Sequence, residues 1–114
     1  MHQDWNFFKN KLFNRIGEFA KLSPDAMRSI TALFNAPTKT GKLDAKTHEL
    51  IALAVAVTTR CDGCIADHSK RALESGATKE EIAEALTVAI GLNAGVALVY
   101  TARVFDAIAQ HESK

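Results

Sequence analysis

The sequence predicts an all-α fold, with one compact domain of about six helices over residues 1–114. Three observations carry this prediction. Apolar residues recur at helical spacing from end to end, start and stop signals divide the chain into helix-sized segments, and no alternation of strands and helices is readable. A chain of 114 residues has the length of a single domain, and no linker or internal repeat divides it.

The N-terminal part predicts two helices. The first carries a largely apolar stripe of Phe7, Phe8, Leu12, Ile16 and Phe19. Ser23 and Pro24 then form a typical start signal, with serine at the N-cap and proline at the first helical position. The second helix carries the apolar residues Met27, Ile30, Leu33 and Phe34. Pro37 and Gly41 are expected to bracket the loop that follows it.

The middle of the chain predicts a buried helix followed by a helix that carries both cysteines. Asp44 is the expected N-cap of a helix over residues 45–58. Residues 50–57 are apolar on every face, which is typical of a helix that is buried all round. Valines in this stretch would also suit a strand, but its length and its alanines favour the helix. The next helix is expected over about 62–75, with Gly76 ending it.

The C-terminal part predicts two helices and an oligomer. Thr78 and Glu81 form a capping box that starts the first of them. Gly91, Asn93 and Gly95 are expected to interrupt the pattern before a last helix. Small residues between positions 83 and 102 let helices approach closely, and the apolar surface exceeds what a monomer of this size easily hides. We therefore expect an intertwined homo-oligomer, with a tightly packed monomer core as the alternative.

The composition excludes several function classes. The formal net charge is +1 and no long run of lysine or arginine occurs, so no electrostatic nucleic-acid footprint is expected. The longest apolar stretch is expected at residues 50–57, far short of the roughly 20 residues that span a bilayer. Residues 1–5 lack the basic start and apolar run of a secretory signal. We therefore expect a cytoplasmic protein without a nucleic-acid or membrane partner.

The two cysteines carry the strongest functional signal. A bond between Cys61 and Cys64 would close a very short loop and remove little entropy from the unfolded chain, so it is a poor structural staple. In a reducing compartment such a pair is more often catalytic or metal-binding. Cys61 and Cys64 are three residues apart, and His68 follows four residues later. On a helix that begins near Cys61, all three side chains share one face.

This arrangement favours thiol chemistry. The nucleophile is the thiolate, and a free cysteine with a pKa of about 8.5 is mostly protonated at neutral pH. The first turn of a helix stabilises an anion, and a protonated His68 would add to this effect. Glu49 is the only acid in residues 45–60, on the helix expected to be most buried. Because a buried carboxylate is costly without a partner, we expect Glu49 to face the cysteine site near His68.

Each of these residues also has a simpler interpretation. The cysteines would otherwise be inert buried thiols, His68 a solvated helix residue, and Glu49 a charge near the start of its helix. Zinc bound by the cysteines and His68 is a further alternative, but structural zinc normally takes four ligands and no second Cys/His pair exists. We therefore expect no metal and no cofactor. His48 points about 100° away from Glu49 on a helix and is not included in the predicted site.

From about Leu43 to Ile108 the sequence resembles the carboxymuconolactone decarboxylase superfamily, specifically its alkylhydroperoxidase (AhpD-like) branch. Three segments carry the resemblance: HELIALAVA at 48–56, RCDGCIADH at 60–68 and ALESGATKEEIAEA at 72–85. The most specific element is C-x-x-C-x-x-x-H, with an acid twelve residues before the first cysteine. One departure is Gly63, because some characterised members carry a second histidine immediately before the second cysteine. Weaker thiol activation or a different substrate is the expected consequence.

The resemblance implies an all-helical homo-oligomer, often a trimer or hexamer, that reduces hydroperoxides. In this scheme Cys64 attacks the peroxide, Cys61 resolves the product to a disulfide, and Glu49 and His68 relay protons. A lipoyl-protein or another dithiol would supply electrons. The same cysteines would also serve a disulfide oxidoreductase or a redox sensor without peroxide activity. A decarboxylase-like lyase is less expected because that branch generally lacks the cysteine pair, and a non-enzymatic binding module is the remaining alternative.

Overall fold

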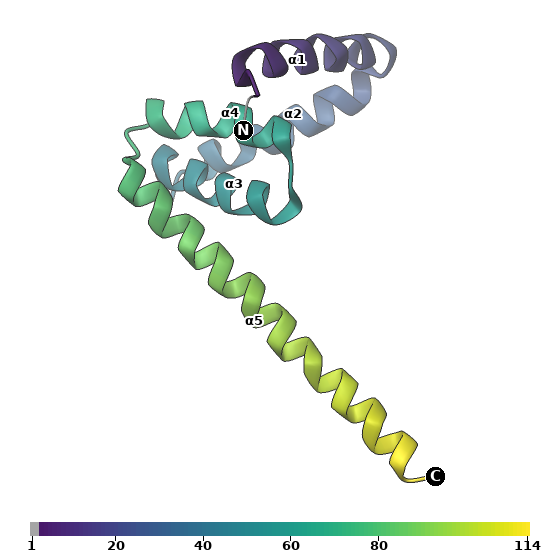
Figure 1. Ribbon diagram of the computed structural model, residues 1–114. Helices are drawn as coiled ribbons and strands as arrows, with labels where there is room; N and C mark the ends of the chain where they lie inside the picture. Colours follow the sequence, from purple (N-terminus) through teal and green to yellow (C-terminus); the bar gives the residue numbers. More distant parts are fainter. Residues whose placement is uncertain (1–2) are drawn as a thin grey trace.

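The computed structural model describes residues 3–114; Met1 and His2, which belong to the N-terminal segment considered for a secretory signal, lie outside the described residues. The described chain contains five helices and no strand, so the predicted all-α class is confirmed. The helices are α1 (Trp5–Leu22), α2 (Pro24–Thr40), α3 (Ala45–Thr59), α4 (Asp62–Glu74) and α5 (Lys79–Glu112). Figure 1 shows α1 to α4 gathered at one end and α5 running away from them as a long rod.

Two of the predicted helix starts have the expected capping geometry. The Asp44 side chain accepts a hydrogen bond of 2.8 Å from the backbone N–H of Thr47 at the start of α3. At the start of α5, Thr78 Oγ1 accepts from the N–H of Glu81, and Glu81 accepts in return from the N–H of Thr78. These contacts satisfy backbone donors that have no partner within the helix. Short-range sequence signals therefore located both starts correctly.

The predicted loop around Pro37 is shorter than expected. Helix α2 continues through Pro37 to Thr40, and Gly41 ends it with a left-handed φ of 67°. The N–H of Gly41 donates to the carbonyl of Pro37 at 2.9 Å. A proline inside a helix removes one backbone donor and crowds the carbonyl four residues earlier, but the Pro37 carbonyl still accepts the Gly41 N–H, and Gly41 supplies the turn that ends the helix.

The predicted interruption at Gly91, Asn93 and Gly95 is absent. All three residues lie within α5, which is why the structure has five helices where about six were expected. Glycine inside a helix costs only about 0.5–1 kcal/mol relative to alanine, which is too little to break a helix of good formers. Asn93 also donates to the Ala89 carbonyl at 2.8 Å and to Thr58 Oγ1 at 2.9 Å, so it joins α5 to α3.

The core lies where α3 meets α4 and α5. Leu53, Ala72 and Ala77 are buried there, with Leu50, Ile82 and Leu86 packed around them. The prediction that α3 is buried all round is wrong for the single chain, because Ile51 is 50% and Val55 56% exposed. The helix packs against two neighbours and leaves its remaining face open.

Helix α5 makes the chain far more extended than the predicted compact domain. The radius of gyration is 19.1 Å, against about 13 Å for a compact domain of this length. Residues 85–102 of α5 carry no charge. By length and composition α5 could cross a membrane, a test that core helices of soluble proteins also pass. Residues 50–57 are thus not the longest uncharged apolar stretch, contrary to the sequence-based expectation.

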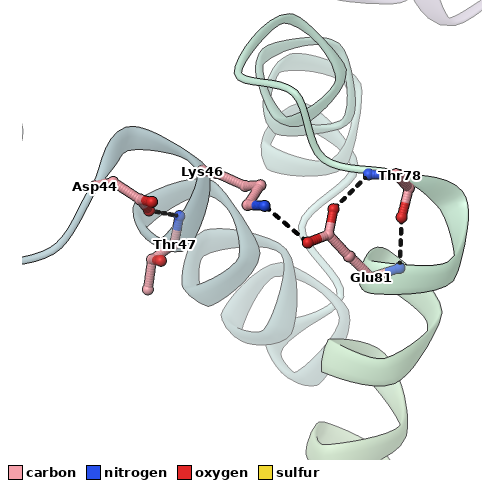
Figure 2. Close-up of polar contacts among 5 residues, drawn as sticks. All are labelled: Asp44, Lys46, Thr47, Thr78 and Glu81. Carbon is pink, nitrogen blue, oxygen red and sulfur yellow. Dashed lines mark hydrogen bonds and ion pairs between the residues drawn. The ribbon is translucent and has the colours of Figure 1, made fainter.

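An ion pair ties the start of α3 to the start of α5. Lys46 Nζ lies 2.7 Å from Glu81 Oε2, while Glu81 Oε1 accepts from the Thr78 N–H (Figure 2). The hydrogen bond from Lys46 holds the pKa of Glu81 below its ordinary range, and the Glu81 carboxylate raises the pKa of Lys46. Hydrogen bonds from the Thr47 side chain and backbone lower the pKa of Asp44 in the same way. Glu81 thus joins two elements and caps one of them.

We predict that Glu81→Gln lowers the urea midpoint of unfolding at neutral pH. The folded pKa of Glu81 is depressed, so its stabilising contribution is present above the ordinary glutamate pKa of about 4.3 and is lost as the pH falls through the folded value. The difference from wild type should therefore vanish in strong acid. Glu80→Gln, in the same first turn, is the control for the helix dipole. Equal decreases in the urea midpoint of the two variants would contradict a specific role for the Lys46–Glu81 ion pair.

Candidate redox site

The cysteines lie at the N-terminus of α4, immediately after a tight turn. Arg60 ends α3 in the left-handed conformation with a φ of 56°, and the N–H of Cys61 donates to the Ala56 carbonyl at 2.9 Å. Cys61 is the N-cap of α4, and its Sγ accepts from the N–H of Cys64 at 3.2 Å. The turn therefore places the first sulfur over the unpaired donors of the helix start.

Cys61 and Cys64 form a disulfide in the structure. Their Cα atoms are 5.2 Å apart, within the range that a disulfide spans. This agrees with the prediction that both thiols share one face at the head of the helix. In the reduced form, a thiolate at either position would meet the positive end of the α4 dipole, which favours the anion.

The predicted contact between Glu49 and His68 is present. Glu49 extends from α3 and His68 from α4, and Glu49 Oε2 lies 2.6 Å from His68 Nδ1. The two side chains are only 14% and 26% exposed, so the carboxylate has found the partner that its burial requires. The contact leaves Nε2 of the imidazole free for a second partner. His68 lies one helical turn after Cys64 on the same face.

The Glu49–His68 pair borders a polar chamber between α2, α3 and α4. This chamber has a volume of about 340 Å³, and Asp67, Arg71 and His48 also line it. Sequence reasoning excluded His48 because of its direction on an isolated helix. No local signal in the sequence identifies His48.

A second, apolar chamber of about 560 Å³ adjoins the polar one. Leu33, Pro37 and His48 line both spaces. The remaining lining residues of the apolar chamber are Ala36, Thr40, Lys42, Leu43 and Ile51. The cleft between α2 and α3 is therefore polar at the end that holds the Glu49–His68 pair and apolar at the other end.

Helix α1 lies against the glycine at position 63. A Cβ placed on Gly63 would lie 2.5 Å from Leu12 Cδ2, which is closer than real side chains approach. Leu12 belongs to α1, which packs against α4. A histidine at position 63, as in the relatives mentioned above, would therefore require Leu12 to move. Here an apolar contact from α1 occupies the flank of the cysteine-bearing turn.

Comparison with known proteins assigns the chain to a family. The sequence pattern that defines the carboxymuconolactone decarboxylase family matches residues 24–107 of this chain.

This chain belongs to the carboxymuconolactone decarboxylase family. An uncharacterised protein of Haemophilus influenzae is 45% identical over 107 residues, covering 94% of this chain and 95% of the relative. An uncharacterised protein of Cupriavidus necator is 35% identical over 102 residues, covering 87% and 88% of the two chains.

Solved structures of two similar proteins share the fold. A carboxymuconolactone decarboxylase family protein of Legionella pneumophila, solved in its apo form, is 36% identical, with a TM-score of 0.75 over 93% of this chain and 95% of that one. A protein of Methanobacterium thermoautotrophicum is 35% identical, with a TM-score of 0.71 over 78% of this chain and 97% of that one. The predicted membership of the carboxymuconolactone decarboxylase family is therefore confirmed, together with the all-helical fold.

We predict that Gly63 and Leu12 are energetically coupled. Alanine favours a helix more than glycine does, but Gly63→Ala should stabilise the protein only when Leu12→Ala has removed the obstructing methyl group. In a double-mutant cycle of urea unfolding, the two substitutions should therefore show an interaction free energy of at least about 0.5 kcal/mol. Gly17→Ala is the control, because its site in α1 has no atom within 4 Å of an added Cβ. If the changes in the free energy of unfolding caused by the Gly63 and Leu12 substitutions were strictly additive, this would argue against a contact between the two positions.

Proposed function

We propose that this protein is a thiol-dependent peroxidase of the alkylhydroperoxidase branch, which reduces hydroperoxides through a Cys61–Cys64 dithiol/disulfide cycle. The observation that carries the proposal is the combination of a cysteine pair at the N-terminus of α4 with the 2.6 Å Glu49–His68 contact one turn further on. The start of α4 favours the thiolate form of the cysteine. The Glu49–His68 pair donates a proton to the oxygen that leaves when the peroxide O–O bond breaks. Family membership supports a link to enzymes, and the cysteine pair distinguishes redox chemistry from decarboxylation.

The first step is peroxide cleavage at Cys64. The thiolate sulfur attacks the terminal oxygen of the hydroperoxide, the O–O bond breaks, and Cys64 becomes a sulfenic acid. The departing alkoxide takes a proton from the protonated imidazole of His68 and leaves as an alcohol. Sulfur is oxidised by two electrons and the peroxide is reduced by two. Glu49 orients the ring and stabilises the imidazolium through its contact with Nδ1.

The second step forms the disulfide, and the third reduces it. The Cys61 sulfur attacks Cys64 Sγ, the S–O bond breaks, and the hydroxide that leaves is protonated to water. An external dithiol, either free or on a lipoyl-protein, then attacks the disulfide. Two exchanges leave the donor oxidised and both cysteines reduced. The cycle needs no metal or other cofactor.

Self-association is part of the proposal. The single chain leaves large apolar side chains exposed on α2, α3 and α5, including Leu33 of α2 and Val99 of α5, which is 74% exposed. Exposed apolar area on this scale is typical of an interface between subunits. We propose a cytoplasmic homo-oligomer, a trimer or hexamer, in which α5 packs against other copies. Sedimentation velocity of the purified protein measures this, and a stable monomer would contradict it.

We predict that Cys64→Ser abolishes hydroperoxide turnover with a dithiol donor. Cys61→Ser should also stop multiple turnovers, but should still consume about one equivalent of peroxide and leave a trappable sulfenic acid on Cys64. Stopped-flow peroxide consumption and mass spectrometry measure both outcomes. Unchanged turnover in Cys64→Ser would reject the mechanism. Reduction of disulfides by the wild type, without any peroxide consumption, would favour a disulfide oxidoreductase or a sensor.

We predict that the Glu49–His68 pair acts on the peroxide step. His68→Gln should lower kcat/KM for the hydroperoxide by about 10²–10⁴-fold, as expected for the loss of a general acid. Glu49→Gln should cause a smaller decrease in kcat/KM, because the His68 imidazole remains but loses its charged partner. Asp67→Asn is the control, since Asp67 lines the same chamber and pairs with Arg71 at 3.6 Å. If Asp67→Asn lowered kcat/KM as much as His68→Gln, the effect would come from a disturbed chamber structure and not from the Glu49–His68 pair.

A further inference from the structure

Helix α1 lies along α4 and reaches the cysteine-bearing turn. Trp5, at the start of α1, borders a cavity of about 310 Å³ together with Ile65 and Leu73 of α4. Two helical turns later, Leu12 lies against Gly63 at the start of α4. Helix α1 therefore runs along α4 in the opposite direction. The rest of α1 extends beyond α4 before the chain turns back into α2 (Figure 1).

Helix α1 is held by few apolar contacts. None of the described residues 5–22 is buried, and Phe19 is 55% and Leu22 87% exposed. The family pattern begins at residue 24, so α1 also lies outside the part of the chain that this pattern covers. Segments with few buried apolar contacts open at a small cost in free energy. A modest change at one contact therefore shifts the balance between docked and undocked α1.

The contact between Leu12 and Gly63 lies on the ring that the disulfide closes. Gly63 stands between Cys61 and Cys64 in the chain, and the disulfide joins these two residues. A Cβ on Gly63 would be 2.5 Å from Leu12 Cδ2, so Leu12 approaches this backbone as closely as only a glycine permits. The contact is therefore sensitive to the position of the backbone in this turn.

Reduction removes a constraint on the same backbone. A disulfide holds the two Cβ atoms about 3.5–4.5 Å apart, whereas the sulfurs of two thiols separate at least to van der Waals contact. Any relaxation of the first turn of α4 carries Gly63 with it. Dispersion contacts are short-ranged, and a gap of about 0.5–1 Å already loses a quarter to a half of the attraction. The observed fit of Leu12 belongs to the oxidised turn.

We propose that α1 docks more tightly on the oxidised turn than on the reduced turn, and that Leu12 is a positioning residue that favours the Cys61–Cys64 disulfide. Coupling between two sites acts equally in both directions, so a disulfide that favours docking of α1 is itself favoured by that docking. This coupling rests on the dithiol/disulfide cycle of the proposed function, and it holds whichever oxidant forms the disulfide.

The coupling makes access to the cysteines depend on their redox state. With the disulfide formed, α1 covers the flank of the turn at Gly63, immediately before Cys64. A dithiol donor attacks the disulfide and the S–S bond breaks. After two exchanges both cysteines are thiols and the donor is a disulfide. Helix α1 then loosens, and this flank of Cys64 opens to the next oxidant.

The reduction potential tests the role of Leu12. The full-length protein is equilibrated in buffers of reduced and oxidised dithiothreitol, and mass spectrometry measures the fraction that holds the Cys61–Cys64 disulfide. Leu12→Ala should raise the reduction potential, shifting the equilibrium constant at least about fivefold, or about 21 mV for this two-electron couple. An unchanged potential in Leu12→Ala would overturn the proposal.

Two variants control for a merely structural effect. Leu12→Met should keep the equilibrium constant within about twofold of wild type, because it retains the apolar volume at the contact. Leu22→Ala makes the same substitution in the same helix at a residue that is 87% exposed, and it should leave the potential unchanged. A shift in Leu22→Ala as large as that in Leu12→Ala would also overturn the role of Leu12.

Amide hydrogen exchange of the wild type tests the docking itself and remains decisive if Leu12→Ala does not fold. Exchange of residues 5–22 should be at least about fivefold faster with the cysteines reduced than with the disulfide formed, whereas exchange in α5 should be unchanged. Cys61→Ser, which cannot form the disulfide, should show the same exchange with and without reductant. Equal exchange of α1 in the two wild-type states would overturn the proposal. A raised potential in Leu12→Ala and a loosened α1, without any peroxide turnover, would overturn the peroxidase proposal and support this coupling.

Discussion

The close packing of α3 against α4 is the constraint on which the candidate site depends. Leu53 of α3 and Ala72 of α4 are buried in one core cluster, with Leu50 packed against it. This packing holds the two helices close enough for Glu49 and His68 to meet at 2.6 Å. The same packing and the tight turn at Arg60 place Cys61 over the start of α4. A separation of the two helices would leave the Glu49 carboxylate without its partner.

The core of the single chain is unusually thin. Apart from Leu53, its buried apolar residues are alanines, whereas large side chains such as Phe34 and Phe105 are about 70% exposed. A core of alanines buries little apolar area and contributes correspondingly little to stability. The apolar faces of α2 and α5 are therefore largely uncovered in the single chain.

The proposed thiol chemistry depends on two features of the site. The start of α4 places Cys61 and Cys64 at the positive end of the helix dipole, and the Glu49–His68 contact places an imidazole one turn further on. Leu12 of α1 lies against Gly63, immediately before Cys64. That flank of the cysteine-bearing turn is therefore apolar.

The sequence by itself determined the helical class, the helix starts at Asp44 and Thr78, and the spacing that unites Cys61, Cys64 and His68. These features depend on residues within about four positions of one another, so local patterns are enough to reveal them. Glu49 was also found, because a lone acid in an apolar helix requires a partner. Only the tertiary structure decided that α5 runs without a break, that α3 is buried on one side, and that His48 and Leu12 border the site. Those outcomes depend on which helix faces which, and contacts between distant segments leave no local pattern in the chain.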